Sequence, residues 1–256
     1  MNVRKWMKRM VILDLLMLGL LFLIHSREEA AHAALETAGR SAAYADLEVG
    51  GQDAAYADLE VGGQSAATGG DGTKRIALTF DDGPHPRYTE KLLDGLKERG
   101  VHATFFVTGA NAEKYPEIVK RMQEEGHLIG NHTYHHVQLT AANGEQFRKE
   151  IISTNEAIRE ITGEDTEYIR PPYGAWNKRY EEELNMFPVL WTIDPRDWCS
   201  DDASCIVRNT IGRVKENDII LMHDQYQSSI AAALEIVDEL QEEGYEFVTV
   251  DELLFD

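Results

Sequence analysis

Short apolar runs alternate with charged amphipathic segments from Lys74 to the end of the chain. The runs are rich in β-branched and aromatic residues and read RIALTF, ATFFVT, HLIGN, EYIR, PVLWTI, DIILMH and EFVTV. Runs of this length and composition are typical of β-strands, and the charged segments between them have the spacing of amphipathic helices. We therefore predict seven strands separated by helices.

Four glycines stand where the predicted helices end. Gly100, Gly126, Gly163 and Gly244 each come shortly before an apolar run, at the place where a left-handed residue commonly ends a helix. Repeated strand–helix–strand units imply an α/β fold with a parallel sheet and right-handed crossovers, either open or closed into a barrel. In a barrel, the functional groups would lie at the C-terminal ends of the strands.

Residues 1–33 have the pattern of an export segment. Four basic residues near the N-terminus precede a mostly apolar run from Met10 to Ile24, and Ala31-His32-Ala33 resembles a signal-peptide cleavage site. This run is short beside the roughly 20 residues that span a bilayer as a helix. A cleaved signal peptide and a retained membrane anchor both fit the pattern. Either one predicts an exported protein, secreted or anchored on the outer face of the cell membrane, because the basic flank stays in the cytoplasm.

Residues 34–73 contain a duplicated unit. The segment Ser41–Gln52 (SAAYADLEVGGQ) recurs as Asp53–Gln64 (DAAYADLEVGGQ), and each copy offers few large apolar groups to bury. Such a composition favours disorder, and two copies are too few for a stacked repeat fold. We interpret residues 34–73 as a flexible, acidic, disordered linker and residues 74–256 as the folded domain that carries the chemistry.

The composition adds a strong acidic bias. Lys and Arg total 25 against 45 Asp and Glu, a formal net charge of −20. This charge argues against nucleic acid as a partner, because phosphate binding needs a basic surface. The two cysteines, Cys199 and Cys205, could form a disulfide in an oxidising compartment, but two free thiols fit the sequence equally well.

Polar clusters follow five of the predicted strands. They are Asp81-Asp82 after RIALTF, His132 and His136 after HLIGN, Arg170 to Gly174 after EYI, Asp194 and Asp197 after PVLWTI, and His223-Asp224 after DIILM. Because the carboxyl ends of parallel barrel strands meet at one rim, we expect all five clusters to converge. Five clusters at successive strand ends indicate a functional site rather than scattered solvated residues.

Two of these clusters have the composition of a metal site. His132 and His136 with one carboxylate supply the ligand set of a catalytic metal that keeps positions open for water and substrate. Zinc is the default ion, and cobalt or another divalent ion is the alternative. Asp81 and Asp82 point in different directions at a strand end, so that one can bind the metal while the other acts as a base. His135 is a competing ligand that the spacing alone does not exclude, and we favour His136.

The motifs that carry these residues resemble those of a known family. TFDDGP (79–84), HTYHH (132–136), RPPYG (170–174), DPRDW (194–198) and LMH (221–223) follow one another along the chain. In order and spacing they resemble the five motifs of the polysaccharide deacetylase family, also called the NodB-homology or carbohydrate esterase 4 family. The resemblance runs from about Arg75 to Leu254 and implies a distorted (β/α) barrel of the NodB-homology type.

The resemblance also implies a metal centre and a base. Asp82, His132 and His136 would bind one divalent ion. Asp81 would be the general base, and Arg170 would orient it. The metal would polarise the acetamide carbonyl and lower the pKa of its bound water, so that Asp81 can take a proton as that water attacks.

For the leaving group, the resemblance implies that His223 is the general acid and that Asp194 pairs with it. We expect Asp194 to favour the charged imidazole by its proximity. A backbone N–H near Tyr173 would help to stabilise the oxyanion. Trp198 and Leu221 match positions that, in the family, form an apolar slot for the acetyl methyl group.

Three neighbouring side chains have weaker assignments. We expect Arg196 and Asp224 to be solvated. For Asp197, a cap on the loop after its strand and a contact with substrate both fit the sequence.

The predicted function is metal-dependent hydrolysis of N-acetyl groups from N-acetylglucosamine-type residues of a cell-wall or extracellular polysaccharide, with release of acetate. Such a protein is a hydrolase that acts on carbon–nitrogen bonds other than peptide bonds. Peptidoglycan, chitin oligomers and poly-N-acetylglucosamine all stay open as substrates, and we expect a monomer that can associate with the membrane through its N-terminal segment. Two other functions stay open: an O-acetyl esterase acting on an acetylated xylan-like polymer, and a catalytically silent wall-binding protein.

Overall fold

The computed structural model describes residues 73–255. The predicted export segment (1–33) and all but the last residue of the predicted linker (34–73) lie outside the described residues. Seven strands form, one for each predicted apolar run, which confirms the number expected. They are β1 (Lys74–Asp81), β2 (Thr104–Val107), β3 (Leu128–Asn131), β4 (Tyr168–Ile169), β5 (Phe187–Pro188), β6 (Ile219–His223) and β7 (Tyr245–Val248).

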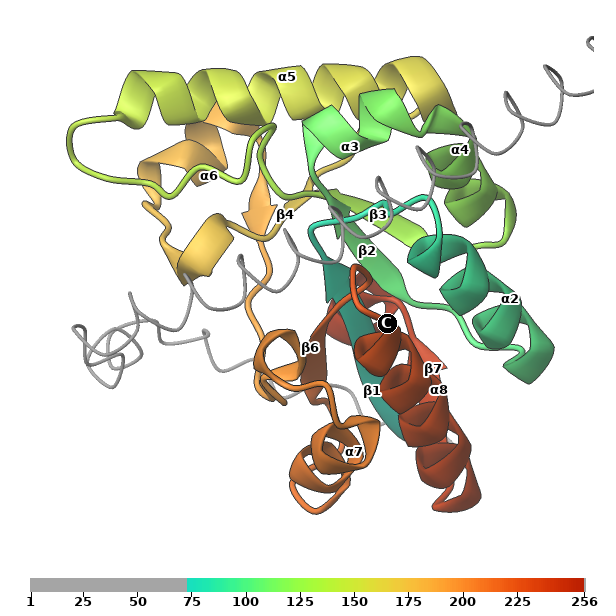
Figure 1. Cartoon of the computed structure of the whole chain (residues 1–256). Helices are drawn as coiled ribbons and strands as arrows, with labels where there is room; N and C mark the ends of the chain where they lie inside the picture. The colour runs from blue at the N-terminus through green and yellow to red at the C-terminus, as the bar shows by residue number, and fades with distance from the viewer. Residues whose placement is uncertain (1–72, 256) are drawn as a thin grey trace, which may run out of the picture. The chain divides into compact units, whose positions relative to one another are not determined.

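These strands form one parallel sheet. Its order is β5-β4-β3-β2-β1-β6, and β7 pairs with the first half of β1. Every pair is parallel, as the alternation of strands and helices predicted. β1 has the most neighbours, because it pairs with β2, β6 and β7 (Figure 1). Its C-terminal end, which Asp81 forms and Asp82 follows, lies between β2 and β6.

The predicted fifth strand is much shorter than expected. Only Phe187–Pro188 forms a strand, beside β4, and the chain then leaves β4 and reaches β6 through a bridge between Ile193 and Ile220. The carbonyls of Val189 and Leu190 do not join a strand ladder, because they accept hydrogen bonds from the Arg170 guanidinium at 3.1 and 3.2 Å. The segment thus connects the two edges of the sheet, which gives the distorted (β/α) barrel that the motifs implied.

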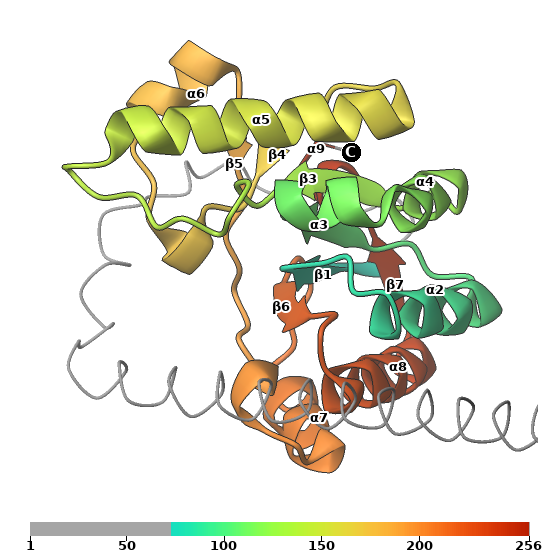
Figure 2. The ribbon, with the colours of Figure 1, turned by 45° about the horizontal axis from the view of Figure 1, so that its top comes forward.

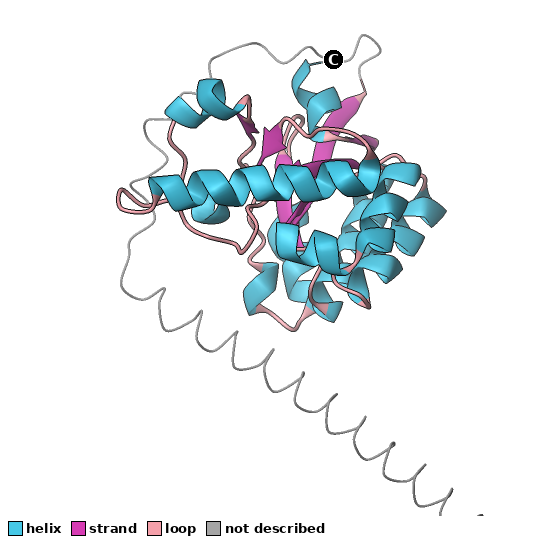
Figure 3. Cartoon of the chain, turned by 90° about the horizontal axis from the view of Figure 1, so that it is seen from above, coloured by secondary structure: helices cyan, strands magenta, loops and turns pink. Residues whose placement is uncertain are grey.

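Helices surround the sheet. They are α2 (Tyr88–Arg99), α3 (Gly109–Lys114), α4 (Pro116–Glu124), α5 (Gly144–Thr162), α6 (Arg179–Leu184), α7 (Ala203–Ile211), α8 (Gln227–Glu242) and α9 (Val250–Phe255), with short 3₁₀ helices η2 (Pro172–Gly174) and η3 (Asp197–Cys199). Figure 2 shows α5, α4, α2 and α8 following one another around the strands, and Figure 3 shows α5 crossing over them. Among residues 73–255, no helix combines the length and the apolar character needed to cross a membrane.

The glycines predicted to end helices do so. Gly100 and Gly163 are the C-caps of α2 and α5, with φ of 63° and 78°. Gly126 and Gly244 follow α4 and α8 by one further residue and also have positive φ. The left-handed conformation is nearly free of strain for a residue without Cβ, so the chain can turn directly from each helix toward the next strand.

Alternate side chains of β1 face two different environments. Ile76, Leu78 and Phe80 belong to the main apolar core, together with residues of α2, α4 and α8. Thr79 and Asp81 lie on the opposite face of the strand and contact the buried guanidinium of Arg170 instead. The apolar face therefore anchors β1 under the helices, and its polar face carries the functional groups.

Candidate functional site

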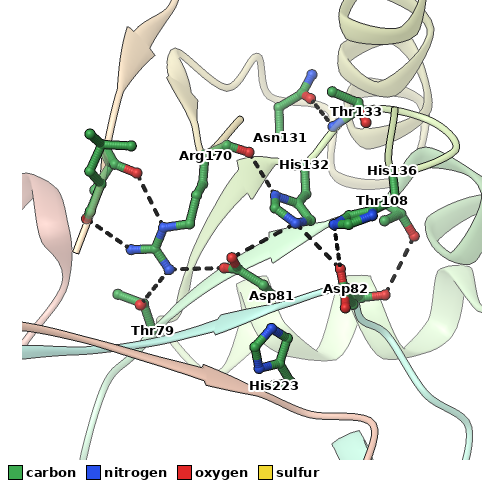
Figure 4. Close-up of polar contacts among 12 residues, drawn as sticks. Thr79, Asp81, Asp82, Thr108, Asn131, His132, Thr133, His136, Arg170 and His223 are labelled. Carbon is green, nitrogen blue, oxygen red and sulfur yellow. Dashed lines mark hydrogen bonds and ion pairs between the residues drawn. The ribbon is translucent and has the colours of Figure 1, made fainter. Parts of the chain in front are cut away.

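The predicted polar clusters meet at one rim of the sheet. Asp81 ends β1, His132 follows β3, Arg170 follows β4 and His223 ends β6. Figure 4 shows these side chains pointing toward one another, with His132 and His136 on one side of the two aspartates and His223 on the other. The convergence expected from the strand ends is confirmed.

Asp82, His132 and His136 form a compact set of candidate metal ligands. Asp82 Oδ1 lies 3.3 Å from His132 Nε2 and 3.4 Å from His136 Nε2. The three ligand atoms all lie within 4.8 Å of one another, and they form the one such cluster found among residues 73–255. Two imidazoles and a carboxylate are the ligand set of many catalytic zinc sites.

The hydrogen bonds around these atoms fit a cation. His132 Nδ1 lies 2.6 Å from the main-chain oxygen of Arg170, which can only accept, so Nδ1 carries the proton of the neutral ring. The lone pair of His132 Nε2 therefore faces Asp82 Oδ1, which is buried without a well-formed hydrogen bond to any described residue. Two acceptors that face each other favour a positive charge between them, which either a proton on His132 or a divalent metal ion can supply.

The electrostatics agree with this geometry. Burial alone would raise the pKa of Asp82, but the nearby histidines hold it well below its usual value, so the carboxylate stays ionised. Burial alone would lower the pKa of His132, yet the carboxylates of Asp81 and Asp82 raise it. The site attracts positive charge strongly, which is the condition for holding a metal ion.

The loop after β3 decides which of the neighbouring histidines faces the carboxylate. His136 turns toward Asp82 with a φ of 55°. His135 is 65% exposed and turns toward α5, where Glu150 Oε1 lies 3.0 Å from its Nδ1 and Oε2 accepts its main-chain N–H. The structure thus places His136, and not His135, with the other two candidate metal ligands.

Arg170 fixes the orientation of Asp81. The guanidinium is fully buried and donates from Nη1 to Asp81 Oδ1 at 2.9 Å and to Thr79 Oγ1 at 2.6 Å. Asp81 Oδ2 is left on the side of the metal ligands, 3.8 Å from His132 Nε2. The contact expected between Arg170 and Asp81 is therefore present, and it directs one carboxylate oxygen toward the site.

The prediction that Asp194 pairs with His223 is wrong. Asp197, and not Asp194, accepts from His223, with Oδ1 2.8 Å from the ring Nδ1 and Oδ2 2.8 Å from the main-chain nitrogen. Asp194 Oδ1 instead accepts the main-chain N–H of Arg196 at 2.7 Å. Arg196 adopts a left-handed conformation, with a φ of 56°, and this turn brings Asp197 into the interior at the start of η3.

Asp197 makes His223 a charged group. Burial would lower the pKa of His223, but the ion pair with Asp197 outweighs it and raises the pKa to about 10. Because Asp197 holds Nδ1, Nε2 is the nitrogen that can give a proton to a ligand. The site therefore carries a protonated imidazole at neutral pH.

The remaining predicted residues lie near the same rim. Tyr173 is 62% exposed, and its ring centre is 5.0 Å from that of His136. Leu221 is buried within β6, and Trp198 is half-buried in η3. The expected apolar slot formed by these two side chains stays a prediction, as does the N–H near Tyr173.

Two further expectations have clear outcomes. Asp224 was expected to be solvated, and this is wrong, because the side chain is fully buried and accepts from Thr89 Oγ1 at 2.5 Å. Burial raises its pKa to about 7. Cys199 and Cys205 are both free thiols in the structure.

Comparisons with known proteins agree on one family. The family model described as polysaccharide deacetylase matches residues 68–189. The peptidoglycan-N-acetylglucosamine deacetylase PgdA of Listeria monocytogenes is 41% identical over 180 residues, which is 70% of this chain and 39% of the relative. A peptidoglycan-N-acetylglucosamine deacetylase of Bacillus cereus is 38% identical over 189 residues, 71% of this chain and 88% of the relative. The chain thus spans well under half of the Listeria relative and most of the B. cereus one.

Three solved structures share the fold. The peptidoglycan deacetylase PdaC from Bacillus subtilis has a TM-score of 0.69 and 41% identity, covering 71% of this chain and 90% of that chain. A family 4 acetyl xylan esterase from Clostridium thermocellum, in complex with a cobalt ion, has a TM-score of 0.66 and 34% identity, covering 70% and 90%. A carbohydrate esterase 4 family pseudoenzyme from Bacillus anthracis has a TM-score of 0.67 and 25% identity, covering 71% and 66%.

Proposed function

The chain belongs to the polysaccharide deacetylase family, and on that premise we propose that it hydrolyses N-acetyl groups of N-acetylglucosamine-type residues in a cell-wall polysaccharide and releases acetate. The membership confirms the resemblance inferred from the five motifs. One observation carries the proposal: a carboxylate base, a three-residue metal-binding set and a charged histidine face one another at a single rim. Each is a part that amide hydrolysis needs.

Asp82, His132 and His136 would hold one divalent ion. When bound, such an ion polarises the acetamide carbonyl and lowers the pKa of a coordinated water. Zinc is the ion we propose, because two imidazoles and a carboxylate suit it, with cobalt as the alternative that the xylan esterase structure supports.

Asp81 acts as the general base in this proposal. Its Oδ1 is held by Arg170, and Oδ2 faces the metal-binding side chains, where it can accept a proton from the attacking water. Because the guanidinium is buried and donates to four oxygens, it cannot follow a movement of the carboxylate. Asp81 therefore stays in place through the reaction.

His223 acts as the general acid. An amine leaves poorly as an anion, so cleavage of an amide requires a proton on its nitrogen. Asp197 keeps His223 protonated and turns Nε2 into the site, from which the proton passes to the departing sugar amine. A main-chain N–H near Tyr173 would add to the stabilisation of the oxyanion.

Peptidoglycan is the substrate class that the relatives favour, since several similar proteins carry that substrate in their names. Chitin oligomers and poly-N-acetylglucosamine present the same acetamido sugar. Ester hydrolysis on acetylated xylan is the second candidate, because the acetyl xylan esterase shares the fold at 34% identity. A silent wall-binding protein is the third, because the family includes a pseudoenzyme. The intact base, metal set and acid argue against it.

An acetate-release assay with the full chain separates these functions. The protein is supplied with Zn²⁺ or Co²⁺ and offered peptidoglycan, N-acetylglucosamine oligomers, poly-N-acetylglucosamine and acetylated xylan. We expect release from the N-acetylated polymers to exceed release from xylan. Faster release from xylan would favour the esterase, and metal binding without release from any polymer would favour the silent protein.

We also propose that residues 1–33 export the chain as a signal peptide or membrane anchor and that residues 34–73 link this segment to a catalytic domain over 74–256. The basic flank and the apolar run support export. In this arrangement the protein works as a monomer on the outer side of the membrane. Fractionation of expressing cells, followed by N-terminal sequencing, would distinguish a cleaved from an anchored protein.

A further inference from the structure

The main chain of Asp82 adopts a conformation that its residue type disfavours. Its φ is 73°, in the left-handed region, where Cβ lies too close to the neighbouring carbonyl oxygen. Asp tolerates this region better than most residues, but something in the surrounding structure must still hold it there. Because Asp82 supplies one of the three metal-binding atoms, its backbone conformation decides where that atom lies.

Side chains from distant parts of the sequence meet at the main-chain oxygen of Asp82. Asn111 Nδ2, from α3, donates to it at 2.8 Å, and Gln225 Nε2, from the loop between β6 and α8, donates at 2.9 Å. Thr108 Oγ1 lies at 3.5 Å, as Figure 4 shows. A carbonyl oxygen has two lone pairs, so the two short amide bonds use its full accepting capacity.

We propose that Asn111 and Gln225 are positioning residues that hold the left-handed main chain of Asp82 and thereby set the metal affinity of the site, an assignment that rests on the proposed metal-dependent function. With its carbonyl fixed by two donors, the peptide unit after Asp82 cannot rotate. The side chain is then held with Oδ1 facing the Nε2 atoms of His132 and His136.

Helix α3, which carries Asn111, also binds the loop between β3 and α5 (residues 132–143). We call this segment the histidine loop, because it contains His132 and His136. The main-chain N–H groups of Gly109 and Ala110, at the start of α3, donate to the main-chain oxygens of Thr133 and Tyr134 at 3.1 Å each. Tyr134 Oη donates to Glu113 of the same helix at 2.7 Å. α3 packs in turn against α4 and α5 (Figures 1 and 3). One short helix therefore sets the separation between the carboxylate ligand and the two imidazoles.

This role differs from a general contribution to stability. Loss of either amide donor leaves the fold of the barrel intact but lets Asp82 relax toward a commoner conformation, which withdraws Oδ1 from the histidines. Outer groups that orient a metal ligand typically change metal affinity by roughly 10- to 100-fold. A residue that only stabilises the fold would lower the melting temperature and leave the affinity of the folded protein unchanged.

The test measures Zn²⁺ affinity of the full chain by competition with a chromophoric chelator. Gln225→Glu and Asn111→Asp keep the shape of each side chain and remove the amide donor. We expect each to weaken Zn²⁺ binding by roughly tenfold or more, and the double variant to weaken it further. Gln138→Ala, at an exposed glutamine of the histidine loop, is the matched control and should bind Zn²⁺ like the parent.

Two other measurements separate positioning from folding. The melting temperature of the metal-free protein should stay close to that of the parent in Gln225→Glu, and the visible spectrum of the Co²⁺-loaded variant should change, because the ligand geometry has changed. Gln225→Glu alone decides the outcome if Asn111→Asp does not fold. A Zn²⁺ affinity within twofold of the parent in Gln225→Glu would overturn the assignment.

A different result would contradict the proposed deacetylase function. A parent protein that binds Zn²⁺ but releases no acetate would contradict the deacetylase while leaving the positioning role open to the same affinity measurement, which then decides it. A parent that binds no divalent ion would overturn both.

Discussion

The positive charge of His223 is stabilised mainly by Asp197, which accepts two hydrogen bonds from it. Asp197 accepts from both the ring Nδ1 and the main-chain nitrogen, and its carboxylate is fully buried. Burial lowers the pKa of His223, but this contact, together with the smaller effects of the Asp82 and Asp81 carboxylates, raises it to about 10. In the proposed mechanism, protonation of the leaving amine by His223 therefore depends on Asp197, a residue that does not need to touch the substrate.

We expect Asp197→Asn to change the pH dependence of the reaction. Without the carboxylate, the pKa of His223 falls toward the ordinary value of about 6.5, so the protonated acid is lost at a lower pH. The alkaline limb of the kcat/KM profile should move to lower pH, and activity on the alkaline side should fall by roughly 100-fold. The measurement is acetate release between about pH 6 and pH 10.

Asp194→Asn is the comparison for this change, because Asp194 accepts a hydrogen bond from the Arg196 main chain and interacts with His223 only through its charge. It should shift the alkaline limb much less than Asp197→Asn does. The same ion pair also contributes to folding stability: since the folded pKa lies above the unfolded one, its contribution is complete below about pH 6.5 and is lost as the pH rises through about 10. An alkaline limb that stays unchanged in Asp197→Asn would show that His223 is not the acid.

At the residue scale, the sequence predicted which side chains gather but not every contact among them. Asp194 and Asp197 both stand in the DPRDW motif, and only the left-handed turn at Arg196 shows which one points inward. The spacing alone does not show whether His135 or His136 is the metal ligand. The contact of His135 with Glu150 turns it away from Asp82 and leaves His136 as the candidate. Such choices depend on local backbone turns and on residues far along the chain, which no local pattern reveals.

At the scale of elements, Arg170 replaces part of a strand ladder. Its guanidinium satisfies the carbonyls of Val189 and Leu190, where the chain crosses from β4 to β6, and also binds Asp81. A PVLWTI run has the composition of a strand, so the sequence predicted one. The structure differs because the buried guanidinium of Arg170, at the end of the neighbouring strand β4, takes the main-chain carbonyls of Val189 and Leu190 as hydrogen-bond acceptors.

We expect Arg170→Met to destabilise the fold by about 3 to 5 kcal/mol, because it leaves the Asp81 carboxylate buried without its partner. Asp81→Asn combined with Arg170→Met should cost less than the sum of the two single changes, by about 1 kcal/mol or more, since the second change removes the unpaired charge. Denaturant unfolding of the four proteins measures this coupling.

Arg179→Met is a suitable control for that cycle, because Arg179 is exposed and its guanidinium lies over the ring of Tyr180 rather than in the site. Its effect on the free energy of unfolding should be small. Strict additivity of the Arg170 and Asp81 changes would mean that the buried contact does not couple them.

The strands were predicted well from the pattern along the chain, with the exception of most of the PVLWTI run, and so were the glycines that follow the helices. The short helix α3, only six residues long, was missed. Its importance comes from contacts with Asp82 and with the histidine loop, which are separated from it in sequence and brought together only by the sheet.

At the scale of the whole molecule, the fold and the family were both predicted from the order of five motifs, and the comparisons confirm them. The polymer that is deacetylated does not follow from these features, because it depends on the loops around the rim and not on the barrel. A family that includes a pseudoenzyme also shows that the fold alone does not establish activity. Activity must therefore depend on the residues of the rim and on the metal ion that we propose they bind.

The most direct test is acetate release from N-acetylglucosamine oligomers by the chelator-treated full chain as Zn²⁺ is added back. We expect release to be absent without the ion, to rise with each addition and to level off at one ion per chain. Asp82→Asn, which removes one of the three metal-binding groups, should show no such rise. Full release by the metal-free protein, or no release by the protein that has bound its ion, would contradict a metal-dependent deacetylase.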